Sequence, residues 1–433
     1  MNKKGLFGLS PLIFFLVFFL GASLICGDFS KVSIIVSFFF ASIYAVAITK
    51  GLSLPDRVRI FGRGAGTTKM MFMVWIFLCA GAFSSSAEAM GCIQETVDCI
   101  LTLLPAQYIY VSLFIAGCFI SMATGSGIGS IVALGPIAIG VAVTTQSNVS
   151  LMCALTVCGA IFGDNLSFIS DTTIIATTTQ GCELKDKFKA NMWIATPAAI
   201  VVAIIYFILG KGVDIPPINA TVEYLKITPY LLVIIMAIAG VDVLILLLTG
   251  TLFCGIMGIC YGDFDFYGWL TAMEKGMCGM GNLLIIVLLA AGLMALINHN
   301  GGIEYLASTC TRFVKGRRSA EAGITILSAL TCICTSNNTI AIITVAPTVK
   351  KISEQYGVDP RKAACLMDTG SCIALELVPY STHLLAAAAL GGVSAATLLP
   401  YVYYPFALII FLILAIVFTF PRLKPLAQSN KKL

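Results

Sequence analysis

Four polar interruptions within long apolar segments constrain how this chain can fold. The first half has Thr-Gly-Ser-Gly at residues 124–127 and Gly-Asp-Asn-Leu-Ser-Phe-Ile-Ser-Asp at 163–171. The second half has Thr-Ser-Asn-Asn-Thr at 335–339 and Glu-Leu-Val-Pro-Tyr-Ser-Thr-His at 376–383. Adding 211 to the first-half numbers superimposes the interruptions without a gap. The same shift superimposes single residues: Thr124 on Thr335, Pro136 on Pro347, Leu166 on Leu377, Ser170 on Ser381 and Gly181 on Gly392.

The composition predicts an integral membrane protein. The chain is 59% hydrophobic and 11% charged, with a mean hydropathy of +0.98, whereas a soluble domain carries roughly 25% charged residues. Its surroundings should therefore be membrane lipid. The net charge of +5 does not indicate a nucleic-acid partner, because the basic residues cluster in loops.

Apolar segments long enough to cross a bilayer need about 20 residues. The predicted spans are 9–26, 32–49, 70–88, 190–210, 227–248, 249–262, 281–298 and 399–420. Between them we expect two hairpins with polar tips, at 105–145 and 319–349, and two broken helices, at 150–182 and 362–392. The predicted fold is an all-α polytopic membrane protein.

The basic residues predict the orientation of the spans. With a cytoplasmic N-terminus and re-entrant hairpins, 22 of the 26 basic residues fall in inner loops, among them Lys187, Lys362, Arg422, Lys424, Lys431 and Lys432. The remaining four, Lys31, Lys211, Lys226 and Lys275, fall in outer loops. The positive-inside rule is therefore satisfied. The two halves, residues 1–215 and 216–433, are then inverted-topology repeats whose hairpin tips meet near the midplane. We expect a bacterial inner-membrane protein with both termini in the cytoplasm.

The interruptions predict a cation site. Non-helical backbone survives at membrane depth only where it is buried in protein or lines a wet cavity, and paired interrupted segments indicate a transporter's binding site. Hydroxyl, carbonyl and carboxylate oxygens suit a hard cation. The candidate ligands from both halves are Thr124, Ser126, Asp164, Asn165, Ser170, Asp171, Thr172, Thr335, Ser336, Asn337, Asn338, Thr339, Asp368, Glu376, Ser381, Thr382 and His383.

Acidic residues at bilayer depth are expensive and therefore functional by default. Asp164 and Asp171 lie on either side of the first broken-helix loop, and Asp368 and Glu376 are expected to flank the second, although Asp368 could instead mark the entrance of its helix. A carboxylate that holds either a proton or Na⁺ is sufficient for exchange. Asp242 could bind an ion or pair with a neighbouring helix. His383 could carry a proton or be structural, and His299 is expected to be structural.

Cysteines and histidines give no sign of a cofactor site. Most of the sixteen cysteines lie in apolar spans, where they behave as small hydrophobic residues. Cys92 and Cys99 lie on a predicted outer segment and could pair, although two unpaired thiols is the preferred interpretation. We expect no cofactor beyond transported Na⁺ and H⁺.

The run at 163–173 resembles the signature of the NhaC family of Na⁺/H⁺ antiporters, Gly-Asp-Lys-(Met/Leu)-Ser-Pro-(Leu/Ile)-Ser-Asp-Thr-Thr. Residues 335–339 are similar to the Ser-Asn-Thr hairpin tips of the wider ion transporter superfamily. This chain has Asn165 and Phe168 where the signature has Lys and Pro. The resemblance implies a scaffold domain, a mobile transport domain that holds the hairpins and broken helices, and a homodimer.

Two hypotheses for the transported species remain open. The first is Na⁺/H⁺ exchange, and the second is Na⁺- or H⁺-coupled transport of a small organic anion or amino acid. The four candidate segments have no Lys or Arg in their membrane portions, which favours a cation. Inverted repeats with broken helices suit alternating access better than they suit a passive channel. An intramembrane aspartyl protease would carry a Gly-x-Gly-Asp motif, which this sequence lacks. We therefore do not expect an enzyme.

Overall fold

The described chain is helical throughout, with no strand in the ranges that follow. The computed structural model describes residues 3–26, 32–168, 170–213, 223–312 and 314–421. Eight of the helices there are long and apolar enough to cross a membrane, or nine if η3 and α20, bent by 51°, count as one span. The chain is therefore a multi-pass membrane protein.

The helices of the first half end with the longest one, α10. In order they are α1 (Lys3–Cys26), α2 (Ile34–Ile48), α3 (Leu54–Ala65), α4 (Thr68–Ala89), α5 (Cys92–Leu103), η1 (Ala106–Tyr108), α6 (Ile109–Thr124), α7 (Gly127–Thr144), α8 (Val149–Leu166), α9 (Asp171–Gln180) and α10 (Leu184–Gly210).

The second half follows the same order of long and short helices. They are η2 (Tyr224–Ile227), α11 (Thr228–Ile238), α12 (Val243–Tyr261), α13 (Phe266–Gly279), α14 (Gly281–His299), α15 (Gly302–Arg312), α16 (Arg317–Thr335), α17 (Asn338–Tyr356), α18 (Pro360–Leu377), α19 (Thr382–Gly391), η3 (Ala395–Tyr401) and α20 (Tyr403–Val417).

The four predicted interruptions are real breaks between helices. The shift of 211 superimposes the end of α6 on the end of α16. It also superimposes the starts of α7, α8 and α9 on the starts of α17, α18 and α19. The breaks have a local cause, since Gly125 and Ser336 both adopt left-handed backbone, with φ of 64° and 52°. The opposite membrane orientation of the halves stays a prediction.

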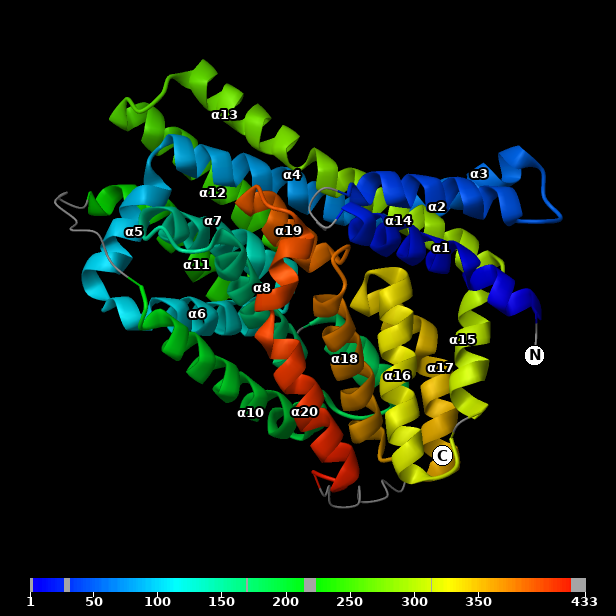
Figure 1. The fold of residues 1–433 in the computed structure, drawn as a ribbon. Helices are drawn as coiled ribbons and strands as arrows, with labels where there is room; N and C mark the ends of the chain where they lie inside the picture. Colours follow the sequence, from blue (N-terminus) through cyan, green and yellow to red (C-terminus); the bar gives the residue numbers. More distant parts are fainter. Residues whose placement is uncertain (1–2, 27–31, 169, 214–222, 313, 422–433) are drawn as a thin grey trace, which may run out of the picture.

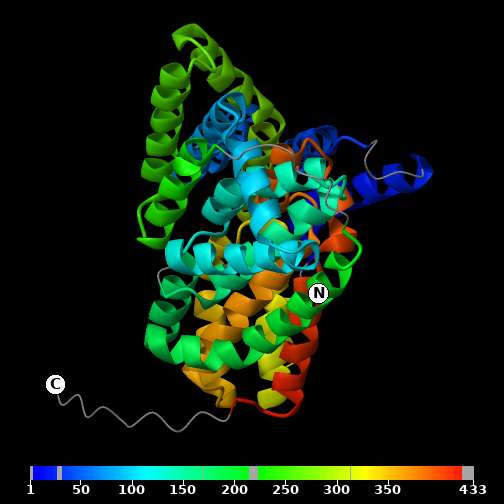
Figure 2. The same ribbon diagram turned by 90° about the vertical axis from the view of Figure 1, so that its left-hand side faces the viewer.

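The two halves are packed into one another rather than side by side. In Figure 1, α4, α13, α14 and α2 run along the top, while α16, α17, α18 and α20 stand below. Helices of different halves contact one another directly, α7 with α19 and α9 with α17 and α18. Figure 2 shows the green helices α11, α12 and α13 at the edge of the molecule. The breaks lie where the two halves interpenetrate.

The predicted boundary between spans 227–248 and 249–262 is wrong. The helix breaks earlier, because Gly240 has a φ of 75° and Asp242 caps α12 by accepting the Leu244 N–H at 2.9 Å. Hydropathy alone did not detect this break, since apolar residues flank it. The segment after Gly262, expected as a loop, forms helix α13.

The preferred interpretation of the outer cysteines is confirmed. Cys92 and Cys99 are both free thiols on the single helix α5. Seven residues of helix advance about 10 Å, which is more than a disulfide spans.

Several predictions lie outside the described residues. They concern the boundary between the halves at 215 and 216 and the loop placement of Lys31, Arg422, Lys424, Lys431 and Lys432.

Candidate functional site

The first hairpin tip is a tight cap that joins α6 to α7. The Thr124 hydroxyl donates to the Ile120 carbonyl at 2.9 Å and accepts the Ser126 N–H at 3.2 Å. Ser126 Oγ accepts the Gly129 N–H at 3.1 Å and so caps α7. The tip therefore presents hydroxyl groups beside the free N–H groups of a helix N-terminus.

The second tip repeats this geometry with amide side chains. Thr335 Oγ1 donates to the Asn337 carbonyl at 2.9 Å, and Asn337 Oδ1 caps α17 by accepting the Ile340 N–H at 3.0 Å. The next side chain reaches into the other half of the protein, since Asn338 Nδ2 donates to Asp164 Oδ2 at 3.0 Å.

Asp164 is the acid at which the two halves meet. It lies in the last turn of α8, is 5% exposed, and its second oxygen accepts the Ser170 hydroxyl at 2.6 Å. The Ser170 side chain makes this bond and does not cap α9. Ser381, at the matching position, caps α19 by accepting the Leu384 N–H at 3.3 Å. The break in the first half is thus built around a carboxylate.

A cavity of about 340 Å³ gathers most of the predicted residues. Candidate ligands from both halves line it: Thr124, Ser126, Asp164, Ser170, Asp171, Thr172, Asn337, Asn338, Thr339, Thr382 and His383. Asp242 and Lys69 lie there as well. Lys69 Nζ is 3.8 Å from Asp171 Oδ2, and the Asp171 side chain is 75% exposed, so this pair is solvated. The cavity therefore combines hydroxyl and amide groups with three carboxylates.

A second cavity of about 230 Å³ adjoins the first. It is lined by Thr335, Ser336, Tyr380 and residues of α14, and it shares Asn337 and Thr382 with the first cavity. Side chains of the second tip and of the second break thus border both spaces.

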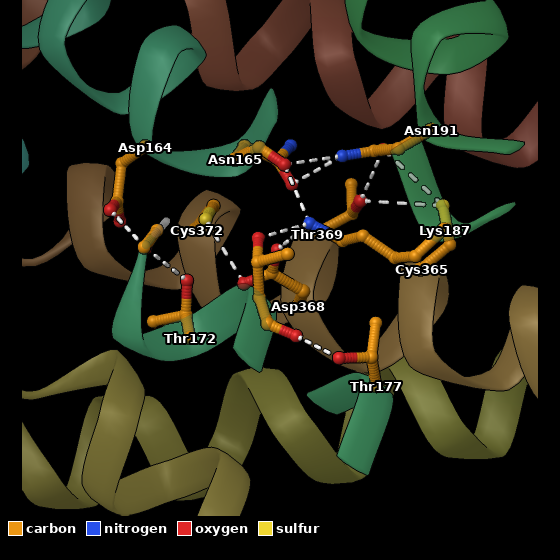
Figure 3. Close-up of polar contacts among 12 residues, drawn as sticks. Asp164, Asn165, Thr172, Thr177, Lys187, Asn191, Cys365, Asp368, Thr369 and Cys372 are labelled. Carbon is orange, nitrogen blue, oxygen red and sulfur yellow. Dashed lines mark hydrogen bonds and ion pairs between the residues drawn. The ribbon is translucent and has the colours of Figure 1, made fainter. Parts of the chain in front are cut away.

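Asp368 does not line either cavity and lies in a buried polar network with Lys187 and Asn165 (Figure 3). Its carboxylate pairs with Lys187 Nζ at 2.5 Å, and both side chains are at most 1% exposed. Lys187 also donates to the Asn165 carbonyl at 2.7 Å and to Thr173 Oγ1 at 2.8 Å. Asn191 Nδ2 donates to both oxygens of Asn165, at 2.7 and 2.8 Å.

The loop placements of Lys362 and Lys187 are wrong. The Lys362 ammonium is buried and pairs with Glu321 at 2.7 Å. Lys187 is the residue beside the site that sequence reasoning missed. It lies in the first turn of α10, where a run of basic residues reads as a cytoplasmic loop. The side chain instead points inward, because Asp368 and the carboxyl end of α8 attract its charge. The one available signal was Asn165: the resembled signature has a lysine at this position, and Lys187 places an ammonium group beside it.

Glu376 and Ser381 are both fully buried and line neither cavity. Within the part of the chain that the structure describes, neither Glu376 carboxyl oxygen has a hydrogen-bond partner. His383 lines the first cavity while being 4% exposed, with Nδ1 3.4 Å from Thr382 Oγ1. His299 is the last residue of α14, and its structural role stays a prediction.

A multi-pass helical fold with broken helices around a polar cavity defines a membrane transporter. The model of the Na⁺/H⁺ antiporter family matches residues 6–211 and 217–420. The chain belongs to the Na⁺/H⁺ antiporter family, and it is a secondary transporter.

Characterised relatives are similar at low identity. The Na⁺/H⁺ antiporter NhaC of Alkalihalophilus pseudofirmus is 22% identical over 72% of this chain and 75% of its own length. The malate-2H⁺/Na⁺-lactate antiporter of Bacillus subtilis is 20% identical over 88% of this chain and 87% of its own. Among solved structures, the Alcanivorax borkumensis YdaH transporter covers 89% of this chain and 98% of its own, with 15% identity and a TM-score of 0.45.

Proposed function

We propose that this protein exchanges Na⁺ for H⁺ and that Asp164 binds the two cations in competition. The observation that carries the proposal is the position of Asp164, a nearly buried carboxylate at the edge of a cavity whose walls come from both halves. A bound Na⁺ would use the carboxylate together with nearby hydroxyl oxygens. A proton would neutralise the same carboxylate and release the cation.

The two neighbouring cavities support alternating access. Asn337 and Thr382 border both, so a small shift of the second tip would open the Asp164 site to one cavity or the other. We propose that the broken helices and hairpins move together for this purpose, within a bacterial inner membrane. Stripes of exposed apolar side chains such as Ile245, Leu252 and Ile256 on α12 support embedding in lipid.

Asp164→Asn and Asp171→Asn test the proposal in everted vesicles that trap a pH-sensitive dye. Wild-type vesicles should lose their acid interior when NaCl is added. Each variant should lower the rate at least about tenfold, because an interaction with a charged group is worth about 1.5–3 kcal/mol. Glu354→Gln, on an exposed position of α17, is the matched control and should behave as wild type. A wild-type rate in Asp164→Asn, with the protein inserted normally, would remove this carboxylate from the mechanism.

A second candidate function is exchange that includes a small organic acid. Lys69 lines the cavity, which is larger than one cation needs, and the Bacillus subtilis relative is named for malate and lactate. The same vesicles separate the two functions. A response to lactate or malate with none to NaCl, LiCl or KCl alone would favour the organic acid.

A further inference from the structure

Among the described residues, four buried polar atoms without hydrogen-bond partners belong to three residues on the mutually packed helices α8, α18 and α20. They are both carboxyl oxygens of Glu376, the hydroxyl of Tyr404 and the amide nitrogen of Asn165, and all three side chains are 0% exposed. Buried polar groups in native proteins are nearly always hydrogen-bonded, so such a group needs an explanation.

The three residues come from helix ends that pack together. Asn165 and Glu376 each lie one residue before the end of their helices, α8 and α18, and the shift of 211 superimposes them. Tyr404, in the first turn of α20, meets Phe162 of α8 edge-on with its ring at 5.9 Å, and α18 packs against both α8 and α20. The group is therefore a structural unit separate from the cavity, which none of these residues lines.

The surroundings of Glu376 offer no charge or hydrogen bond, among the described residues, that would stabilise an ionised carboxylate. An ionised carboxylate in a buried apolar site needs an opposite charge or several hydrogen bonds, and Glu376 has no hydrogen bond. The one ammonium group of the neighbouring network, Lys187, is paired with Asp368. The titratable groups facing Glu376 from α6, α8, α10 and α20 are thiols and phenols, which are uncharged at neutral pH: Cys118, Cys158, Tyr206 and Tyr404.

We propose that Glu376 is a second proton site, separate from the Asp164 cation site, and that Tyr404 and Asn165 stabilise its carboxylate after the proton leaves. A proton from water forms the O–H bond of the acid and returns to water on release. The Tyr404 O–H and the Asn165 N–H are both free to donate to the resulting anion. This inference rests on the proposed function, because the second proton would accompany the one that Asp164 exchanges.

Asn165 also connects the Asp164 cation site to the Glu376 proton site. It follows Asp164 directly, and both of its oxygens are held by Asn191 and Lys187, which leaves its amide nitrogen for Glu376 or Tyr404. A cation that moves Asp164 would therefore move the donor that the Glu376 anion needs. Two protons against one Na⁺ carry a net charge, so the exchange should respond to membrane potential.

Purified protein in liposomes tests this stoichiometry. We would measure ²²Na⁺ uptake at imposed potassium-diffusion potentials, together with ²²Na⁺/Na⁺ counterflow. In the wild type the equilibrium Na⁺ ratio should shift about fifty-fold per 100 mV, the work of moving one charge. Glu376→Gln should keep counterflow and Na⁺/H⁺ exchange but lose the dependence on potential, and Glu376→Asp should retain it.

Other outcomes separate this inference from the proposed function. A wild type indifferent to potential, or a Glu376→Gln variant that keeps the dependence, overturns the second proton site. Loss of counterflow in folded Glu376→Gln also overturns it, since Glu376 would then bind the cation. Absence of any Na⁺-driven pH change in the wild type would refute the proposed function itself. If Glu376→Gln does not fold, Tyr404→Phe serves instead: losing a donor to the anion should move the exchange optimum to higher pH, and an unchanged optimum counts against the site.

Discussion

At the scale of single residues, the pair that Lys187 of the first half forms with Asp368 of the second has an apolar counterpart under the shift of 211. The shift of 211 maps Lys187 onto Leu398 and Asp368 back onto Val157, and both of these apolar side chains are 0% exposed. Lys187 and Asp368 join α10 to α18, whereas Leu398 and Val157 lie on η3 and α8, which also pack together. The contact between the halves is thus charged at one place and aliphatic at its counterpart. Charge inside a protein is costly unless it is paired, so packing alone did not require this network.

Removing one member of this pair should be far more harmful than removing both. Asp368→Val leaves the Lys187 ammonium buried without its counter-charge, which costs about 3–5 kcal/mol. Combining it with Lys187→Leu copies the apolar residues at the counterpart positions, Val157 and Leu398, and should recover much of that loss. Thermal unfolding of the purified variants in detergent measures both effects. Additive losses in the double variant would show that the two charges do not stabilise one another.

At the scale of helices, α6 and α8 approach closely because glycines face the contact. A Cβ atom on Gly159 would lie 2.5 Å from the Phe114 carbonyl oxygen, and one on Gly163 would lie 2.5 Å from the Cys118 carbonyl oxygen. Small residues at such spacing allow membrane helices to pack backbone to backbone. This contact sets the position of the α8 carboxyl end and hence of Asp164.

Gly159→Ala should destabilise the protein, whereas Gly117→Ala on the facing helix should be tolerated. A Cβ atom on Gly117 would meet its nearest neighbour at 3.5 Å, an ordinary contact, while the one on Gly159 would force two backbones apart. We expect a loss of about 1–3 kcal/mol from overpacking in Gly159→Ala alone, measured as the fraction of monodisperse protein after heating. Equal behaviour of the two variants would mean that α6 and α8 can separate freely.

At the scale of the whole molecule, the halves share their helix boundaries but not their chemistry. The loops that join α7 to α8 and α17 to α18 contain Gln146 and Gly357, which the shift superimposes and which both have positive φ, 52° and 66°. The family match also falls into two stretches, which begin at residues 6 and 217. These observations support the proposal of two repeats, and the loop charges predict that they are inverted.

Cysteine labelling tests the inversion. Gln146→Cys and Gln355→Cys occupy exposed positions at the loop ends of the two hairpins. In a background that replaces the exposed Cys26, Cys260 and Cys278 by Ser, a membrane-impermeant maleimide should label position 146 from outside the cell and position 355 only in everted vesicles. Labelling of both from the same side would contradict the inverted arrangement.

The sequence determined the local features of this protein. Hydropathy predicted a multi-pass helical fold, because a bilayer admits long apolar helices with internal hydrogen bonding. Gly125 and the capping side chains of Ser126 and Asn337 predicted the breaks, since such residues end and begin helices through contacts within a few positions. Residues adjacent to these breaks, Asp164 among them, were therefore identified from the chain alone.

Only the tertiary structure decided which polar groups meet. The partners of Asp164, Asp368 and Glu376 are set by packing between distant helices, and no local pattern shows that Lys187 points inward rather than into a loop. The break at Gly240 was not predicted for a related reason, because a helix boundary between apolar residues does not change the hydropathy of the sequence. Whether a buried acid is paired, as Asp368 is, or isolated, as Glu376 is, depends on the side chains that other helices bring to it.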